Sequence, residues 1–160
     1  MSILTTKLGN LKPGYLPRFK DFFEQVTQFG GGAEGDKYLK AKSFSNAYEL
    51  YIYAFFIGLY KDKKIDITQD DKTQGFWEMK NWKPKELTDS VITCAIAVSD
   101  FNMNAIEDGD DKFVTEQIKL LKTEIESYAN GGLSYIKSEI DQDPELLEDD
   151  MYFIRLLQEK

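Results

Sequence analysis

The sequence predicts a mostly α-helical protein that folds as a single domain over residues 1–160. Apolar residues recur at helical spacing in several segments, and residues that start or stop helices flank those segments. With 160 residues, the chain is long enough to build a core without disulfides or a metal, and its 42% hydrophobic share is ordinary for a globular protein. We expect a bundle of about six helices around a central apolar helix, allowing one short extended segment near residues 65–68.

The central helix is predicted over residues 45–60, where nearly every position is apolar. Ser45 or Asn46 can cap its start, and a charged turn follows its end. A helix that is apolar on all sides belongs inside a protein. Its apolar stretch is too short to cross a bilayer, which takes about 20 residues. Its expected core residues are Tyr51, Ile52, Phe55 and Leu59.

Five further helices are predicted from spacing, over residues 17–29, 85–99, 111–128, 133–140 and 144–157. The segment 85–99 also fits a buried strand, because a short apolar run suits both structures. Asn130 and Gly131 tolerate a left-handed backbone and are expected to end the helix before them. Residues 1–15 are expected to be irregular, and residues 30–42 and 61–84 to be connecting loops.

The clearest helical pattern has an apolar stripe and a polar face. The stripe consists of Val114, Ile118, Leu121, Ile125 and Tyr128. Glu126 is assigned to the opposite, charged face. In the last helix, Asp143 is the expected cap, and the inner side is expected to carry Leu147, Ile154 and Leu157.

Charge and composition limit the function. The net charge of −8, with no basic patch in the sequence, disfavours direct binding of nucleic acid and favours basic partners. The chain has no histidine, the usual base beside a nucleophilic serine or cysteine. The single cysteine, Cys94, excludes an internal disulfide and is expected to be a small core residue. We expect a cytoplasmic protein without a cofactor.

Three patterns bear on binding or catalysis. Residues 30–37 nearly match a phosphate-binding loop, but Asp36 would repel phosphate there. The acidic segment 100–111 places Asp100, Asn102, Asn104 and Asp111 at spacings used by calcium loops, although Ala105 stands where the sharp turn needs glycine. A solvated acidic loop is therefore the favoured interpretation, and a calcium-binding module is the alternative. A small hydrolase or transferase using carboxylates stays open as well, although no pair of carboxylates stands out.

Two aromatic residues and three lysines are the candidate interaction residues: Lys61, Lys63, Lys64, Trp77 and Trp82. The two tryptophans lie close together in the sequence, a pattern more typical of a loop pinned to a core than of a ligand contact.

Two segments resemble a known family. They are Tyr48-Glu-Leu-Tyr-Ile-Tyr-Ala-Phe-Phe-Ile-Gly-Leu-Tyr-Lys-Asp-Lys-Lys64 and Glu126-Ser-Tyr-Ala-Asn-Gly-Gly-Leu-Ser-Tyr-Ile-Lys137. Together with the spacer between them, they are similar to the small DNA-phosphorothioation-associated proteins of the Dnd systems, over residues 42–141. The resemblance implies an accessory role without catalytic residues. The expected partner is then a protein, basic or DNA-binding, of a DNA modification or restriction system.

Overall fold

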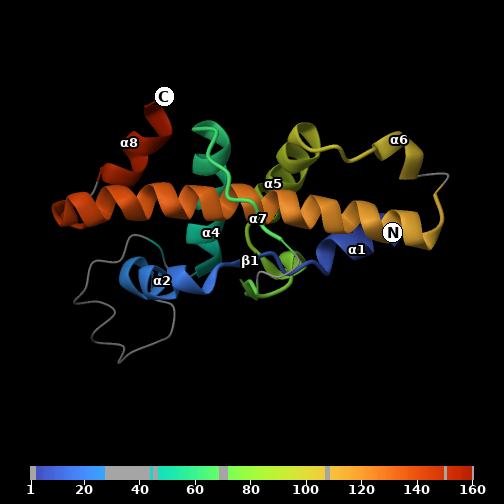
Figure 1. Cartoon of the computed structure of the whole chain (residues 1–160), viewed down its shortest axis with the longest axis horizontal. Coiled ribbons are helices and arrows are strands. Elements are labelled where there is room, and N and C mark those ends of the chain that lie inside the picture. Colours follow the sequence, from blue (N-terminus) through green and yellow to red (C-terminus); the bar gives the residue numbers. More distant parts are fainter. Residues whose placement is uncertain are drawn as a thin grey trace.

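The fold is built on one long helix that a shorter apolar helix crosses near its middle (Figure 1). The long helix, α7, spans Asp111–Gln142, and the crossing helix, α4, spans Ala47–Tyr60. The computed structural model describes residues 3–27, 44, 47–68, 72–106, 109–149 and 151–159. The predicted connection over residues 30–42 and the predicted cap residues Ser45 and Asn46 lie outside this part.

Shorter elements surround the α4–α7 pair and confirm the mostly α-helical prediction. They are α1 (Ile3–Gly9), β1 (Gly14–Tyr15), the 3-10 turn η1 (Pro17–Phe19), α2 (Lys20–Val26), β2 (Gln74–Gly75), the 3-10 turn η2 (Met79–Asn81), α5 (Lys85–Val98), α6 (Met103–Ile106), the 3-10 turn η3 (Pro144–Glu148) and α8 (Tyr152–Gln158). In the view of Figure 1, α1 and α2 lie on one side of α7, and α5, α6 and α8 on the other. Within the described ranges, no helix combines the length and apolarity that a membrane span requires.

The crossing of α4 and α7 depends on glycines in both helices. A Cβ atom added at Gly58 would lie 2.0 Å from the carbonyl oxygen of Tyr128, and one added at Gly132 would lie 1.8 Å from that of Ala54. The two backbones therefore touch, and no larger residue fits at either position. The predicted helix end at Asn130–Gly131 is wrong, because the glycines stay helical where α4 needs this close approach.

The apolar stripe predicted for α7 is confirmed. All five of its residues are buried, and the stripe continues through Leu133, Ile136 and Ile140, which were assigned to a separate helix. At the N-terminus of α7, the Asp110 carboxylate accepts a hydrogen bond from the backbone N–H of Phe113 over 2.8 Å, as an N-cap does.

The N-terminal segment is more ordered than predicted. Residues 1–15 were expected to be irregular, but α1 covers Ile3–Gly9 and β1 follows. β1 pairs antiparallel with β2, with Gly14 opposite Gly75. The described residues 61–68 contain no strand, so the extended pairing involves β1 and β2 rather than residues 65–68. The predicted helix 17–29 appears as η1 followed by α2, and Phe29 lies outside the described residues.

The segment predicted as either helix or strand is helical. α5 begins after Pro84 and buries Thr88, Val91 and Ala95. Cys94, expected in the core, is a free thiol that is only partly buried at the core's edge. It lies one position away from the buried Ala95 and thus off the inward face of α5.

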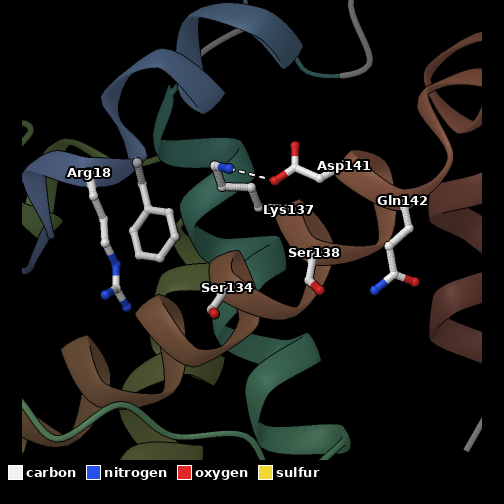
Figure 2. Close-up of a pocket in the computed structure, with 7 residues that line it drawn as sticks. Arg18, Ser134, Lys137, Ser138, Asp141 and Gln142 are labelled. Atoms are coloured by element: carbon white, nitrogen blue, oxygen red, sulfur yellow. Dashed lines mark hydrogen bonds and ion pairs between the residues drawn. The ribbon is translucent and has the colours of Figure 1, made fainter.

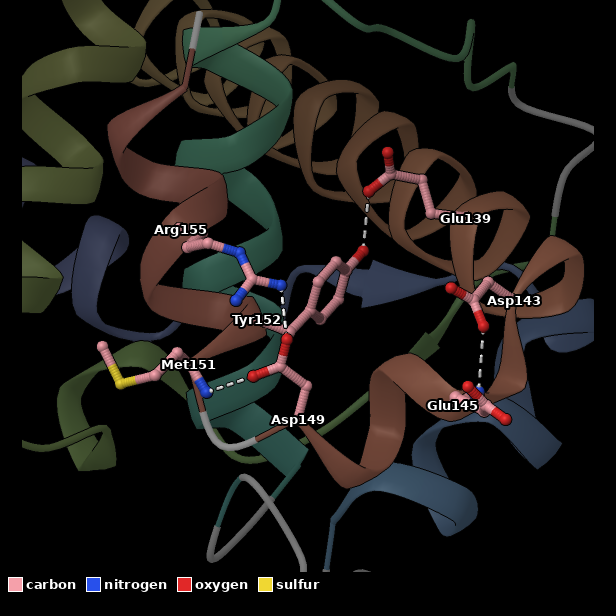
Figure 3. A network of polar contacts seen from close by, with 7 residues as sticks. All are labelled: Glu139, Asp143, Glu145, Asp149, Met151, Tyr152 and Arg155. Atoms are coloured by element: carbon pink, nitrogen blue, oxygen red, sulfur yellow. Dashed lines mark hydrogen bonds and ion pairs between the residues drawn. The ribbon is translucent and has the colours of Figure 1, made fainter.

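The C-terminal region corrects the prediction of one continuous helix. η3 ends at Glu148, Asp149 is extended, and α8 starts at Tyr152 (Figure 3). As predicted, Asp143 caps this region by accepting a hydrogen bond from the N–H of Glu145 over 3.3 Å.

The interruption changes which residues of α8 face inward. Ile154 and Leu157, predicted on the inner side, are 47% and 48% exposed, whereas Tyr152 and Leu156 are buried. The Tyr152 hydroxyl donates to the Glu139 carboxylate of α7 over 2.7 Å, and Arg155 forms an ion pair with Asp149 (Figure 3).

Of the remaining core predictions, three residues of α4 are confirmed, whereas Leu147 of η3, expected on the inner side, is only partly buried. Tyr51, Ile52 and Phe55 of α4 are each 4% exposed or less. Leu59 is only partly buried against the core, because it lies near the end of α4, beside the charged turn.

Candidate functional site

The charged turn at residues 61–64 is held by backbone contacts with α4 and α7. The backbone N–H of Lys63 donates to the Gly58 carbonyl of α4 over 2.7 Å, and that of Ile65 donates to the Ser127 carbonyl of α7 over 3.0 Å. The Lys63 carbonyl lies against Gly131, where an added Cβ would come within 2.1 Å of its oxygen. The turn is therefore fixed in place by backbone contacts.

These contacts bring together the two segments that carry the family resemblance. Gly58 and the lysine turn belong to the first segment, and Ser127 and Gly131 belong to the second. The structure supports close packing for Gly58, Gly131 and Gly132 alike.

The three lysine side chains differ in their environments. Lys61 donates to the backbone carbonyl of Glu159 over 3.0 Å, and its ammonium lies 5.2 Å from the centroid of the Tyr135 ring. Lys64 forms a 2.9 Å ion pair with Glu124 and lies 5.0 Å from the Tyr128 ring centroid.

The hydrogen bond to Glu124 is the main reason why the pKa of Lys64 is raised. Lys63 is exposed and forms no ion pair within the described ranges. It is therefore the lysine of the three whose charge is most available to a ligand.

The two tryptophans have opposite roles. Trp82 is 2% exposed, and its indole N–H donates to the Trp77 carbonyl over 2.9 Å. It pins the loop to the core, together with Phe76, whose ring centroid lies 5.3 Å from that of Tyr51. Trp77 is 62% exposed and has its ring centroid 5.8 Å from that of Tyr48. Of the two, only Trp77 exposes its ring at the surface.

A buried polar cluster, which the sequence did not predict, joins the N-terminal segment to α7. Glu126, assigned to the polar face, is only 4% exposed, and Asn130 is fully buried. One Glu126 carboxylate oxygen accepts hydrogen bonds from the N–H of Gly14 over 2.9 Å and from the Thr73 hydroxyl over 2.7 Å. The Asn130 side-chain oxygen accepts a hydrogen bond from the N–H of Leu16 over 2.8 Å.

The Gly14 carbonyl completes the cluster. It accepts hydrogen bonds from the Tyr51 hydroxyl over 2.8 Å and from the Asn130 amide over 3.1 Å. Burial, and then the nearby Glu126 carboxylate, raise the pKa of Tyr51 well above its usual value. Since these polar atoms are used to hold β1, the cluster acts as a structural clamp. Its only signal in the sequence is the four-residue spacing of Glu126 and Asn130, which places both on one face of a helix.

The described residues of the acidic segment, 100–106 and 109–111, include a contact with α7. Asp100, Asn102, Asn104 and Asp111 are exposed, and α6 occupies Met103–Ile106 in the middle of the segment. The N–H of Asn102 donates to the Gln117 side chain over 3.0 Å. In the part of the chain that the structure describes, no three His, Cys, Asp or Glu side chains are grouped closely enough to hold a metal ion.

Comparison with protein families gives a match. The family model described as DNA sulphur modification system-associated protein 4 matches residues 36–160, more than three quarters of the chain. A search of curated proteins and a search of solved structures gave no match. The matched region contains α4, the lysine turn, both tryptophans and all of α7. The chain therefore belongs to the family of DNA sulphur modification system-associated protein 4.

Proposed function

We propose that the protein is a non-enzymatic accessory component that binds another protein of a DNA sulphur modification system. Family membership gives the association with such a system. The observation that carries the binding role is the lysine turn. Two segments more than sixty residues apart in the sequence are packed backbone to backbone. This packing fixes the turn from which the Lys63 side chain is exposed to solvent.

The chemistry of the surface favours a basic or DNA-binding protein as the partner. The net charge of −8 favours association with a basic surface, and Lys63 supplies a local contact for an acidic side chain of that partner. Trp77 adds a rigid aromatic contact of the kind that often contributes much of the binding energy at an interface. Such binding would take place in the cytoplasm, where the host's DNA is modified.

The test is affinity capture of the tagged full-length protein from a native host, comparing the unchanged chain with Lys63→Glu. Lys61 and Lys64 are left unchanged, because their side chains bond to Glu159 and Glu124. Lys112→Glu is the matched control, since Lys112 is an exposed lysine near the start of α7.

We expect the unchanged chain and the control to recover a protein of the sulphur modification system, and Lys63→Glu to recover several-fold less of it. Capture that brings down no component of such a system would refute the proposal. Equal recovery by all three forms would show that the lysine turn is not the contact.

A further inference from the structure

We propose that the face of α7 around Ser134 and Ser138 binds phosphate groups. The sequence suggests no basic patch, but the fold brings basic side chains from three segments to this face. The N-terminal segment contributes Arg18, the turn after α4 contributes Lys63 and Lys64, and α7 contributes Lys137. This inference does not depend on the proposed protein partner.

Two adjoining hollows form the site. The first, of about 550 Å³, is lined by Arg18, Phe19, Ser134, Lys137, Ser138, Asp141 and Gln142 (Figure 2). The second, of about 280 Å³, lies towards the lysine turn and shares Ser134 and Ser138 with the first. Because both serines line both hollows, a ligand with two phosphate groups can occupy the two together.

The charge of the lining is opposite to that of the whole protein. Four cationic side chains line the two hollows, and two of them are ion-paired, Lys137 with Asp141 of the lining and Lys64 with Glu124 beside it. The whole chain has a net charge of −8. A local excess of positive charge in an acidic protein attracts an anion to this place rather than to the surface in general.

The donors are suited to phosphate. Guanidinium, ammonium and hydroxyl groups all donate hydrogen bonds. Hydrogen bonds from the charged guanidinium and ammonium groups to phosphate oxygens are stronger than those between neutral groups. The guanidinium carbon of Arg18 lies 5.0 Å from the centroid of the Phe19 ring, which is itself buried. This contact restricts the conformations of the Arg18 side chain, so that less conformational entropy is lost on binding. Neither Arg18 nor Lys63 forms an ion pair with any described residue.

The carboxylate of Asp141 is expected to weaken the binding of phosphate. It forms a 2.6 Å ion pair with Lys137, as Figure 2 shows, and a phosphate would compete for that ammonium. Asp141→Asn removes the lining carboxylate and releases Lys137. We therefore expect it to strengthen phosphate binding, a change that a loss of folding cannot produce.

The experiment uses calorimetric titration of the full chain with inorganic pyrophosphate, and fluorescence anisotropy with a short labelled single-stranded oligonucleotide. For pyrophosphate we expect a dissociation constant of about 1 mM or below. Arg18→Gln and Lys137→Gln each weaken binding about fivefold or more, since each removes a charge-assisted hydrogen bond. Asp141→Asn strengthens it about two- to fivefold, the value of an exposed ion pair.

Lys119→Gln is the control. Lys119 is an exposed lysine of the same helix and lines a separate hollow with Lys7. It lies 18 residues before Lys137, about 27 Å along the axis of α7 and well beyond the screening distance at physiological salt. Its substitution should leave the affinity unchanged.

The two ligands identify the source of the phosphate. Tighter binding of pyrophosphate supports a small phosphate compound, and tighter binding of the oligonucleotide supports a nucleic-acid strand. The proposal would be overturned if neither ligand binds at ligand concentrations well above about 1 mM. An affinity that Arg18→Gln, Lys137→Gln and Asp141→Asn all leave unchanged would overturn it too.

Discussion

Replacing Gly132 by alanine tests whether the α4–α7 crossing determines the structure of α7. In an ordinary helix interior this change stabilises, by about 1 kcal/mol, because alanine is the better helix former. Here the added Cβ would lie 1.8 Å from the Ala54 carbonyl oxygen and 2.7 Å from its carbonyl carbon. Both atoms belong to the backbone of α4, so no side-chain rotation relieves the overlap.

The magnitude follows from the distance. Ordinary contact needs roughly 3.5 Å, so α4 must retreat by about 1.7 Å from α7. Overpacking of this kind costs about 3 kcal/mol, which leaves a net loss of about 2 kcal/mol after the gain in helix propensity. For a protein of this size, the melting temperature should fall by about 4–8 °C.

The assay is thermal and urea unfolding followed by circular dichroism. Ser138→Ala is the control, because Ser138 is an exposed residue of the same helix. Gly58→Ala should destabilise as well, and the double variant should lose less than the sum, since one displacement of α4 relieves both overlaps. A Gly132→Ala protein that melts at or above the temperature of the unchanged chain would refute the reasoning.

Two further predictions concern buried and exposed carboxylates. Glu126→Ala leaves the Gly14 N–H and the Thr73 hydroxyl without their acceptor and should cost about 2–4 kcal/mol in urea unfolding, whereas Glu126→Gln, which keeps an acceptor oxygen, should cost clearly less. The hydrogen bond from Arg155 lowers the pKa of Asp149 in the folded protein. The pair therefore stabilises the folded state at pH values above the pKa of aspartate in the unfolded chain, about 3.9. The stability difference between the unchanged chain and Asp149→Asn should therefore be present at neutral pH and disappear as the pH falls through the folded pKa; a difference that persists below it would contradict this assignment.

The helical fold was predictable because it rests on local patterns. The stripe from Val114 to Tyr128 repeats at helical spacing and is buried as expected. The cap at Asp143 is equally local, since the carboxylate bonds to a backbone N–H two residues later. Such signals require only neighbouring residues, which a single sequence shows.

The errors occur where the structure depends on distant residues. Asn130 and Gly131 have the local character of a helix end, but the carbonyl of Lys63 occupies the space beside Gly131 and the helix continues. Glu126 has the character of a surface residue, but Gly14 covers it from the other end of the chain. For α8, the extended Asp149 changes the inward face, which spacing alone does not show.

The candidate site was predicted in part. The lysine turn and the two tryptophans were predicted as interaction residues from their residue types. Only the structure shows that Lys63 and Trp77 are exposed and that Trp82 is buried. The cationic face of α7 was missed because Arg18, Lys63 and Lys137 are far apart in the sequence. No local composition shows that they line neighbouring hollows.

The clamp at Gly14 has a practical consequence for how the protein is divided into parts. The family match begins at residue 36, but the strand β1 and the helix α2 precede it and fill the core with Tyr15, Phe22 and Phe23. A shortened form starting at residue 36 would remove the hydrogen bonds that Glu126 and Asn130 make to Gly14 and Leu16, and would uncover an aromatic surface. The N-terminal segment before the matched region is therefore part of the folded core, and expression of residues 36–160 alone should yield aggregated protein.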